Sequence, residues 1–105
     1  MAESVQEFFD TLPSKVDKEG TKGITNSYLF EIKDVGTWHV AVNNGDVTVT
    51  KGEQDADVRI GMSEEIFQKL IAGKQNPMTA VMTGKIKVKG NMGAASKLQK
   101  ILPQS

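Results

Sequence analysis

The fold is decided by residues 56–102, which read ADVRIGMSEEIFQKLIAGKQNPMTAVMTGKIKVKGNMGAASKLQKIL. The pattern of apolar residues in this stretch predicts five elements. They are a strand over residues 56–62, a capped amphipathic helix over 63–72, a short helix from Asn76-Pro77 to Gly84, a strand over 85–89 and a final helix opened by residues 90–93. Ser63 is a favoured helix cap, and proline is favoured at the first helical position. The alternating lysines of residues 85–89 suit a strand at the edge of a sheet.

The residues before this stretch add a helix and three further strands. Residues 4–7 form a capping box, apolar residues follow at helical spacing, and Pro13 is expected to end this first helix. The period then changes to two, with apolar side chains alternating over residues 28–33, 37–42 and 47–50. Asn44-Gly45 predicts a tight hairpin between two of these strands. Together with the strand over 56–62 they predict an antiparallel meander, one face of which is apolar and covered by the helices.

The composition limits the classes of protein to consider. The 105 residues suffice for one domain, and we expect a single domain over residues 1–105. Cysteine is absent, which excludes disulfides and cysteine-based metal sites or nucleophiles. The N-terminus lacks a basic segment followed by an apolar one, so we expect no secretory signal. The C-terminus is not a peroxisomal tripeptide. These features predict an intracellular, cytoplasmic location.

Charge is distributed unevenly along a chain whose net charge is zero. All 13 acidic residues lie at or before Glu65, and seven lysines with no acidic residue follow from Ile66 onward. Two interpretations remain open at this point: a solvated surface whose charges segregate by chance, or a face that meets anionic lipid or an acidic partner. Nucleic acid is not an expected partner, because the basic segment has no aromatic residue beyond Phe67 and so lacks stacking platforms.

No arrangement of residues in the sequence indicates catalysis or a metal site. His39 is the only histidine, and without an evident nucleophile or carboxylate to orient it we expect a surface histidine in a strand. Asp55 and Asp57 lie in a turn before a strand, and Glu64 and Glu65 start a helix. Carboxylates at such positions are typical of solvated turns and helix caps rather than of acid–base pairs.

Methionine is the best local hint of a function. Met62, Met78, Met82 and Met92 fall within a short part of the chain, and methionine lines adaptable apolar pockets. The same residues also fit the ordinary filling of a core, and the sequence leaves both alternatives open. Residues 90–93 before the last helix are compatible with an anion site, but a plain turn and helix cap is the simpler interpretation.

Four motifs in fixed order resemble the sterol carrier protein 2 family. They are ADVRIGMSEE at 56–65, AGKQNP at 72–77, GKIKVKGNMG at 84–93 and KLQ at 97–99, which together cover about half of the chain. The resemblance implies an α+β fold in which helices cover one face of a five-stranded, mainly antiparallel sheet and enclose an apolar tunnel. It also implies non-enzymatic lipid binding and transfer, with a fatty acid, fatty acyl-CoA, phospholipid or sterol as the ligand and no cofactor.

The resemblance also assigns site residues at matching positions. The tunnel would be lined by Phe67, Leu70, Ile71, Met78, Val81, Met82, Met92, Ala95 and Leu98. Contact with a headgroup or a membrane surface would involve Thr83, Lys85, Lys87 and Lys89. Met82 is expected to point at the sheet, because it follows Met78 at helical spacing. The chain departs from the family where Val81-Met82-Thr83 replaces a frequent aromatic pair and glutamine, so a plain acyl chain is expected over a sterol.

Two rival functions stand beside a lipid carrier. An interaction module would close its groove on a partner, as an accessory subunit beside a lipid-handling enzyme. A small hydrolase would need a nucleophile and a base in a recognisable arrangement, which the sequence lacks. The expected partners are therefore a lipid ligand and, transiently, an anionic membrane surface, and the sequence does not predict an oligomeric state.

Overall fold

The computed structural model describes residues 5–16, 18–95 and 97, which form a five-stranded sheet and four helices. In chain order the elements are α1 (Val5–Lys15), β1 (Thr25–Ile32), β2 (Gly36–Asn43), β3 (Asp46–Lys51), β4 (Val58–Met62), α2 (Glu64–Ile71), α3 (Pro77–Met82), β5 (Lys87–Gly90) and α4 (Met92–Ala95). The α+β fold implied by the resemblance is confirmed. None of these helices is long and apolar enough to cross a membrane.

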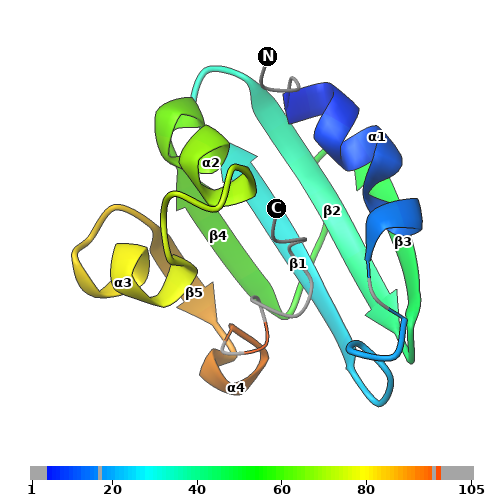
Figure 1. The fold of residues 1–105 in the computed structure, drawn as a ribbon. Helices are drawn as coiled ribbons and strands as arrows, with labels where there is room; N and C mark the ends of the chain where they lie inside the picture. Colours follow the sequence, from blue (N-terminus) through cyan, green and yellow to red (C-terminus); the bar gives the residue numbers. More distant parts are fainter. Residues whose placement is uncertain (1–4, 17, 96, 98–105) are drawn as a thin grey trace.

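The sheet has the strand order β3-β2-β1-β4-β5, which places β1 at its centre and β5 at an edge (Figure 1). Three neighbouring pairs are antiparallel, and β1 and β4 pair in parallel. The predicted meander is confirmed for β1, β2 and β3 but is wrong for β4, which does not continue beside β3. The burial of side chains at the centre of β1 fits this strand order. Tyr28, Leu29 and Phe30 are all buried, as expected of a strand with a neighbour on each side and cover on both faces.

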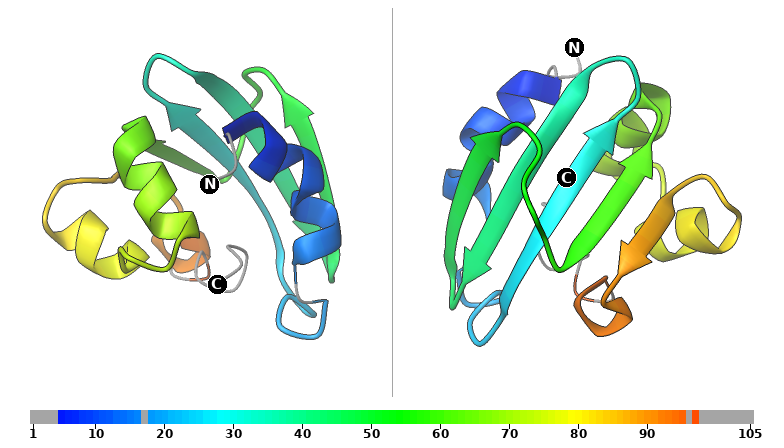
Figure 2. Two further views of the ribbon diagram at one scale, coloured as in Figure 1. Left: turned by 45° about the horizontal axis from the view of Figure 1, so that its top comes forward. Right: turned by 180° about the vertical axis from the view of Figure 1, so that it is seen from behind.

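The connection from β3 to β4 crosses the face of the sheet that carries no helix. Residues 52–57 run across β2 and β1 on this side, which Figure 2 shows from behind. We call this side the helix-free face. The crossing accounts for Leu29, whose side chain alternates away from the helices and is nevertheless 0% exposed.

All four helices lie on the opposite face (Figure 2), where aromatic side chains fill the space between α1 and α2. The ring of Phe9 stacks on that of Trp38 with 4.8 Å between centroids, and Phe67 meets Phe8 edge-on at 5.2 Å. All four side chains are buried. Because such aromatic pairs contribute ~0.5–1.5 kcal/mol beyond the burial of their surface, they fix α1 and α2 against each other and against the sheet.

Helix α1 continues through Pro13, so the predicted end of this helix is wrong. Pro13 has no N–H to donate within the helix, but the N–H of Val16 still donates to the carbonyl of Leu12 at 3.1 Å. The extra turn buries Val16 on the same side as Leu12. Burial of this side chain offsets the hydrogen bond that proline removes.

The predicted helix starts beside β4 and β5 are confirmed. The hydroxyl of Ser63 accepts a hydrogen bond from a backbone N–H of α2 at 3.3 Å. The side-chain oxygen of Asn76 accepts from two N–H groups of α3, at 2.9 and 3.2 Å, and Pro77 follows it. Asn91 likewise accepts from the Ala94 N–H at 3.1 Å, which supports the interpretation of residues 90–93 as a turn and cap.

One junction at Asp57 joins β1, β4 and the turn between β5 and α4. The N–H of Ser27 donates to Asp57 Oδ2 at 2.9 Å, and the N–H of Asp57 donates to Ser27 Oγ at 3.0 Å. The carbonyl of Asp57 accepts from the N–H of Asn91 at 2.9 Å. Gly90 has a φ of +116°, and a Cβ at this position would collide with the Asp57 carbonyl oxygen. Glycine is therefore required at position 90.

Replacing Gly90 with alanine should lower the free energy of unfolding by more than the same change at Gly52. The two residues have φ values of +116° and +118°, but a Cβ at Gly52 would meet nothing within 4 Å. Gly52→Ala therefore carries the backbone strain alone, ~1–2 kcal/mol, whereas Gly90→Ala adds the collision with Asp57. Urea denaturation of both variants measures the difference, and equal losses would show that the Asp57 carbonyl moves aside at no cost.

Tyr28 fastens α4 to the centre of the sheet, and removing its hydroxyl should destabilise the protein. This hydroxyl donates to the carbonyl of Ala94 at 2.7 Å, and both residues are buried. Tyr28→Phe should lower the free energy of unfolding by ~1–3 kcal/mol, because a buried carbonyl loses its donor. Hydrogen exchange should also accelerate at the Ala95 N–H of α4, which donates to the carbonyl of Asn91 just before this helix. Unchanged stability and exchange would contradict this role of the hydroxyl.

The effect of Tyr28→Phe should depend on alkaline pH. Burial, and to a lesser degree the charge of Asp57, raise the pKa of the Tyr28 phenol from 10.0 to about 12. The stability that the raised pKa contributes is complete below pH 10.0 and is lost as the pH rises through about 12, because the unfolded chain releases the proton first. The difference in free energy of unfolding between the parent protein and Tyr28→Phe should shrink over this range. A difference that stays constant in urea titrations across this range would count against the shift.

Candidate functional site

The described residues among those predicted to line an apolar tunnel come from α2, α3 and α4, which cover the β4 and β5 side of the sheet (Figure 1). Phe67, Leu70 and Ala95 are buried, Ile71 and Val81 are half-buried against the core, and Leu98 lies outside the described residues. The structure therefore brings five of the predicted residues to the apolar interior beneath these helices. Phe67 also packs against the rings of α1.

The methionines divide into two groups. Met62 at the end of β4 is 6% exposed and belongs to the core. Met78, Met82 and Met92 are 42%, 83% and 61% exposed, so these side chains lie at the surface of α3 and α4. The expectation that Met82 points at the sheet is wrong. The buried residues of this short helix are Pro77 and Ala80, and the small side chain of Ala80, 0% exposed, lets α3 approach the core closely.

The residues predicted for headgroup or membrane contact are all exposed: Thr83, Lys85, Lys87 and Lys89. Lys87 pairs in register with Gly61 of β4, and Lys89 with Arg59. Because directly paired residues of antiparallel strands share a face, both lysines project from the helix-free face. The described residues that are predicted to line a tunnel belong to helices on the other side of the sheet. This placement favours a role for Lys87 and Lys89 away from a ligand held beneath the helices.

The structure shows a groove on the helix-free face that the sequence pattern does not predict. Its volume is about 990 Å³, at the upper end of the range for ligand clefts. The groove lies along β4 and β5 and reaches the turn between β1 and β2, and we call it the outer groove. Gly61 leaves it open, because a Cβ at this position would meet nothing within 4 Å. A glycine inside a predicted strand is the one signal in the sequence that indicates such an approach site.

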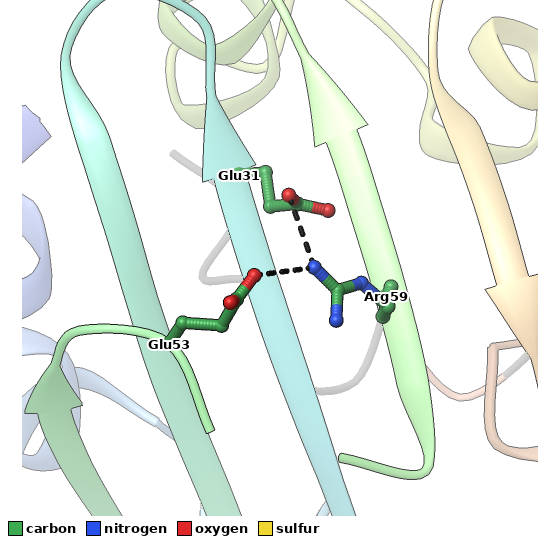
Figure 3. Close-up of polar contacts among 3 residues, drawn as sticks. All are labelled: Glu31, Glu53 and Arg59. Carbon is green, nitrogen blue, oxygen red and sulfur yellow. Dashed lines mark hydrogen bonds and ion pairs between the residues drawn. The ribbon is translucent and has the colours of Figure 1, made fainter. Parts of the chain in front are cut away.

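Part of the charge in the outer groove is already paired. Arg59 donates to Glu53 at 2.7 Å and to Glu31 at 3.3 Å (Figure 3). The hydrogen bonds to Glu53 and then to Glu31 raise the pKa of this guanidinium above its ordinary value. Glu53 belongs to the connection that crosses the sheet, and Glu31 belongs to β1. The cluster therefore holds the connection against the sheet.

The polar residues considered for catalysis, all in the described part of the chain, do not lie in an arrangement of nucleophile and base. His39 is half-buried in β2 on the helix-free face, Asp57 is bonded to Ser27, and Glu65 forms an exposed ion pair with Lys69 at 3.2 Å. Within residues 5–16, 18–95 and 97, no group of three histidine, aspartate or glutamate side chains is arranged to hold a metal ion. The geometry offers an apolar interior beneath α2, α3 and α4 and a charged groove on the opposite face.

Comparison with known proteins agrees with this architecture. The model of the SCP-2 sterol transfer family matches residues 5–103. Hydroxysteroid dehydrogenase-like protein 2 of Xenopus laevis is 39% identical over 98% of this chain, and the match covers 26% of that protein. The chain thus spans about a quarter of the length of the curated relatives of that name that it matches.

Solved structures show the same arrangement. The apo form of sterol carrier protein 2 from Yarrowia lipolytica has a TM-score of 0.74 and 32% identity, with 90% of this chain and 86% of that chain covered. A sec-alkylsulfatase from a Pseudomonas species has a TM-score of 0.82 at 24% identity over 99% of this chain and 17% of that chain, which is a likeness of fold alone. The family match over residues 5–103, together with a mixed sheet covered on one face by four helices, shows that this chain belongs to the SCP-2 sterol transfer family.

Proposed function

We propose that this domain binds and transfers lipid without catalysing a reaction, and that it holds an acyl chain between the sheet and helices α2, α3 and α4. Membership of a family described by sterol transfer is the observation that carries the proposal. The apolar side chains beneath these helices support it: Phe67, Leu70, Ile71, Val81 and Ala95. The proposed ligands are fatty acids, fatty acyl-CoA or phospholipids, with sterol disfavoured, and an intracellular location is part of the proposal.

Removal of the acyl chain from water would drive binding. Each buried methylene contributes ~0.8 kcal/mol, so a long chain has ample drive even after ordering costs. The α3 and α4 side is where a ligand would disturb the least packing. Helices α1 and α2 are joined by stacked rings, whereas α3 has six residues, α4 has four, and both expose methionine. Helix α3 can shift outward without breaking the aromatic cluster, whereas an outward shift of α4 would break the hydrogen bond from Tyr28 to the Ala94 carbonyl.

The exposed methionines of α3 and α4 are the proposed entrance. Met78 and Met82 lie four residues apart on one helix and so share a face, and Met92 begins the next helix. Exposed apolar side chains of this kind enter the interfacial layer of a membrane, and nearby lysines are attracted to anionic lipids. Lys74 lies shortly before α3 in the chain and is exposed. Transient contact with an anionic membrane would therefore occur through this end of the helix layer.

An accessory role beside an enzyme is the second candidate, and one observation favours it. The curated relative named for a hydroxysteroid dehydrogenase contains the matched segment as 26% of its length. In such an arrangement the domain would present lipid to an associated enzyme or close on a partner. Native mass spectrometry separates the two functions: co-purified lipid supports the carrier, whereas a lipid-free obligate dimer supports the accessory module.

Val81→Phe should lower the affinity for a fluorescent fatty acid about tenfold. The added ring would exclude about two methylenes of the ligand, each worth ~0.8 kcal/mol. If the space beneath α3 accepts a ligand, the thermal midpoint of the ligand-free variant should hold, whereas overpacking of a solid core would cost ~1–3 kcal/mol. Thr79→Phe, at an exposed position of the same helix, is the matched control and should change neither quantity. A large drop in midpoint with intact binding would assign Val81 to the core.

Replacing Met78 and Met82 together by serine should slow the transfer of fatty acid from anionic vesicles and leave equilibrium affinity nearly unchanged. The change removes the apolar contact with the membrane but no side chain of the buried lining. Stopped-flow transfer of a fluorescent fatty acid measures the rate. Lys87→Gln with Lys89→Gln is the comparison pair on the opposite face. A slower rate in the lysine pair alone would move the membrane contact to the helix-free face.

A further inference from the structure

The outer groove carries positive charge that lipid binding beneath the helices does not use. Its lining contains five basic and two acidic side chains. The basic side chains are Lys33, Arg59, Lys85, Lys87 and Lys89. Arg59 is engaged by two carboxylates, but in the part of the chain that the structure describes no ion pair is found for the four lysines. The groove is therefore a concave surface with unpaired positive charge.

The lysines of β5 repeat at the spacing of an extended chain. Side chains on one face of a strand recur every second residue, which separates Lys87 from Lys89 by about 6.6 Å along the strand. Lys85 lies in the bend before the strand and also lines the groove. A peptide in the extended conformation with an acidic residue at every second position has the same repeat. A peptide that lies in the groove along β5 on the helix-free face would therefore meet Lys87 and Lys89 in register.

A flat membrane or a small phosphate matches the groove less well than a peptide. A bilayer reaches only the rim of a concave site of about 990 Å³. Phosphate is held best by the planar fork of arginine, and the one arginine of the groove is occupied by Glu31 and Glu53. Separated lysines instead attract a partner whose negative charges are also separated, and Gly61 and Gly84 leave room for its backbone.

We propose that the outer groove is a docking site for an extended acidic peptide segment of a protein partner. The site lies on the opposite face of the sheet from the proposed lipid site, so it does not depend on lipid binding. The matched segment makes up 26% of one curated relative, so a domain of this kind also occurs within a longer protein chain.

The first test titrates the full chain with a labelled peptide of alternating glutamate and valine at low salt, followed by fluorescence anisotropy. Saturable binding is expected, and a matched peptide of glutamine and valine should not bind. Lys87→Gln with Lys89→Gln should weaken binding about tenfold. Lys69→Gln with Lys74→Gln changes the net charge equally but leaves the groove lining intact, and it should have little effect. Equal weakening by both pairs would reduce the interaction to general charge attraction and overturn the site.

The second test fills the groove without changing its charge. Gly61→Phe places a ring where a Cβ meets no neighbour, so the fold should tolerate it. Peptide affinity should fall at least about tenfold, while fatty-acid affinity and the thermal midpoint stay unchanged. Unchanged peptide binding would overturn the proposal. A different result is that the protein binds no peptide but sediments with phosphatidylserine vesicles, and that Gly61→Phe or the pair Lys87→Gln with Lys89→Gln abolishes this sedimentation. Such a result would assign the helix-free face to membrane binding and would also overturn the proposal. If the parent protein binds no fatty acid, this result would contradict the proposed lipid-binding function but not the peptide site in the outer groove.

Discussion

The parallel pairing of β1 with β4 depends on Asp57, and most of the architecture follows from that pairing. A hairpin sets its own register through its turn, but a strand that arrives by a crossing connection has no such guide. The two hydrogen bonds between Ser27 and Asp57 supply the guide, since the ladder begins at the next pair, Tyr28 with Val58. The carbonyl of Asp57 also accepts a hydrogen bond from the N–H of Asn91, which follows Gly90 at the end of β5. Both neighbours of β4 are thus aligned by one residue.

Features set by neighbouring residues could be predicted from the sequence. Asn44 and Gly45 have φ values of +49° and +93°, as the predicted hairpin turn requires, and Ser63 and Asn76 cap the helices that their positions indicate. The place of β4 could not be predicted in this way, because Asp57, which aligns this strand, bonds to Ser27, a residue 30 positions away in the chain. Pro13 misleads for a similar reason, because the helix that continues past it buries Val16, and this burial depends on the tertiary packing.

The candidate site could be predicted only in part. Helical spacing correctly brings Leu70 and Val81 to the inner side, but in a helix of six residues it does not reveal which position points inward, and Ala80 takes the place expected for Met82. The outer groove is lined by residues from separate segments of the chain, so no single sequence motif predicts it. The sheet separates these two regions. Of the seven lysines that follow Ile66, β5 carries Lys87 and Lys89 on the helix-free face.

The stacking of Phe9 on Trp38 has a consequence for observing this protein. Trp38 is the one tryptophan of the chain, and it is 1% exposed. Its indole lies nearly parallel to the Phe9 ring, at 11°, and the amine of Lys51 approaches the same indole to 5.5 Å. Because the ring that shields it belongs to α1, the wavelength of intrinsic emission reports whether α1 is seated on the sheet. Release of that helix would expose the indole to water and shift its emission to longer wavelength. Intrinsic fluorescence therefore detects the position of α1 without an added label.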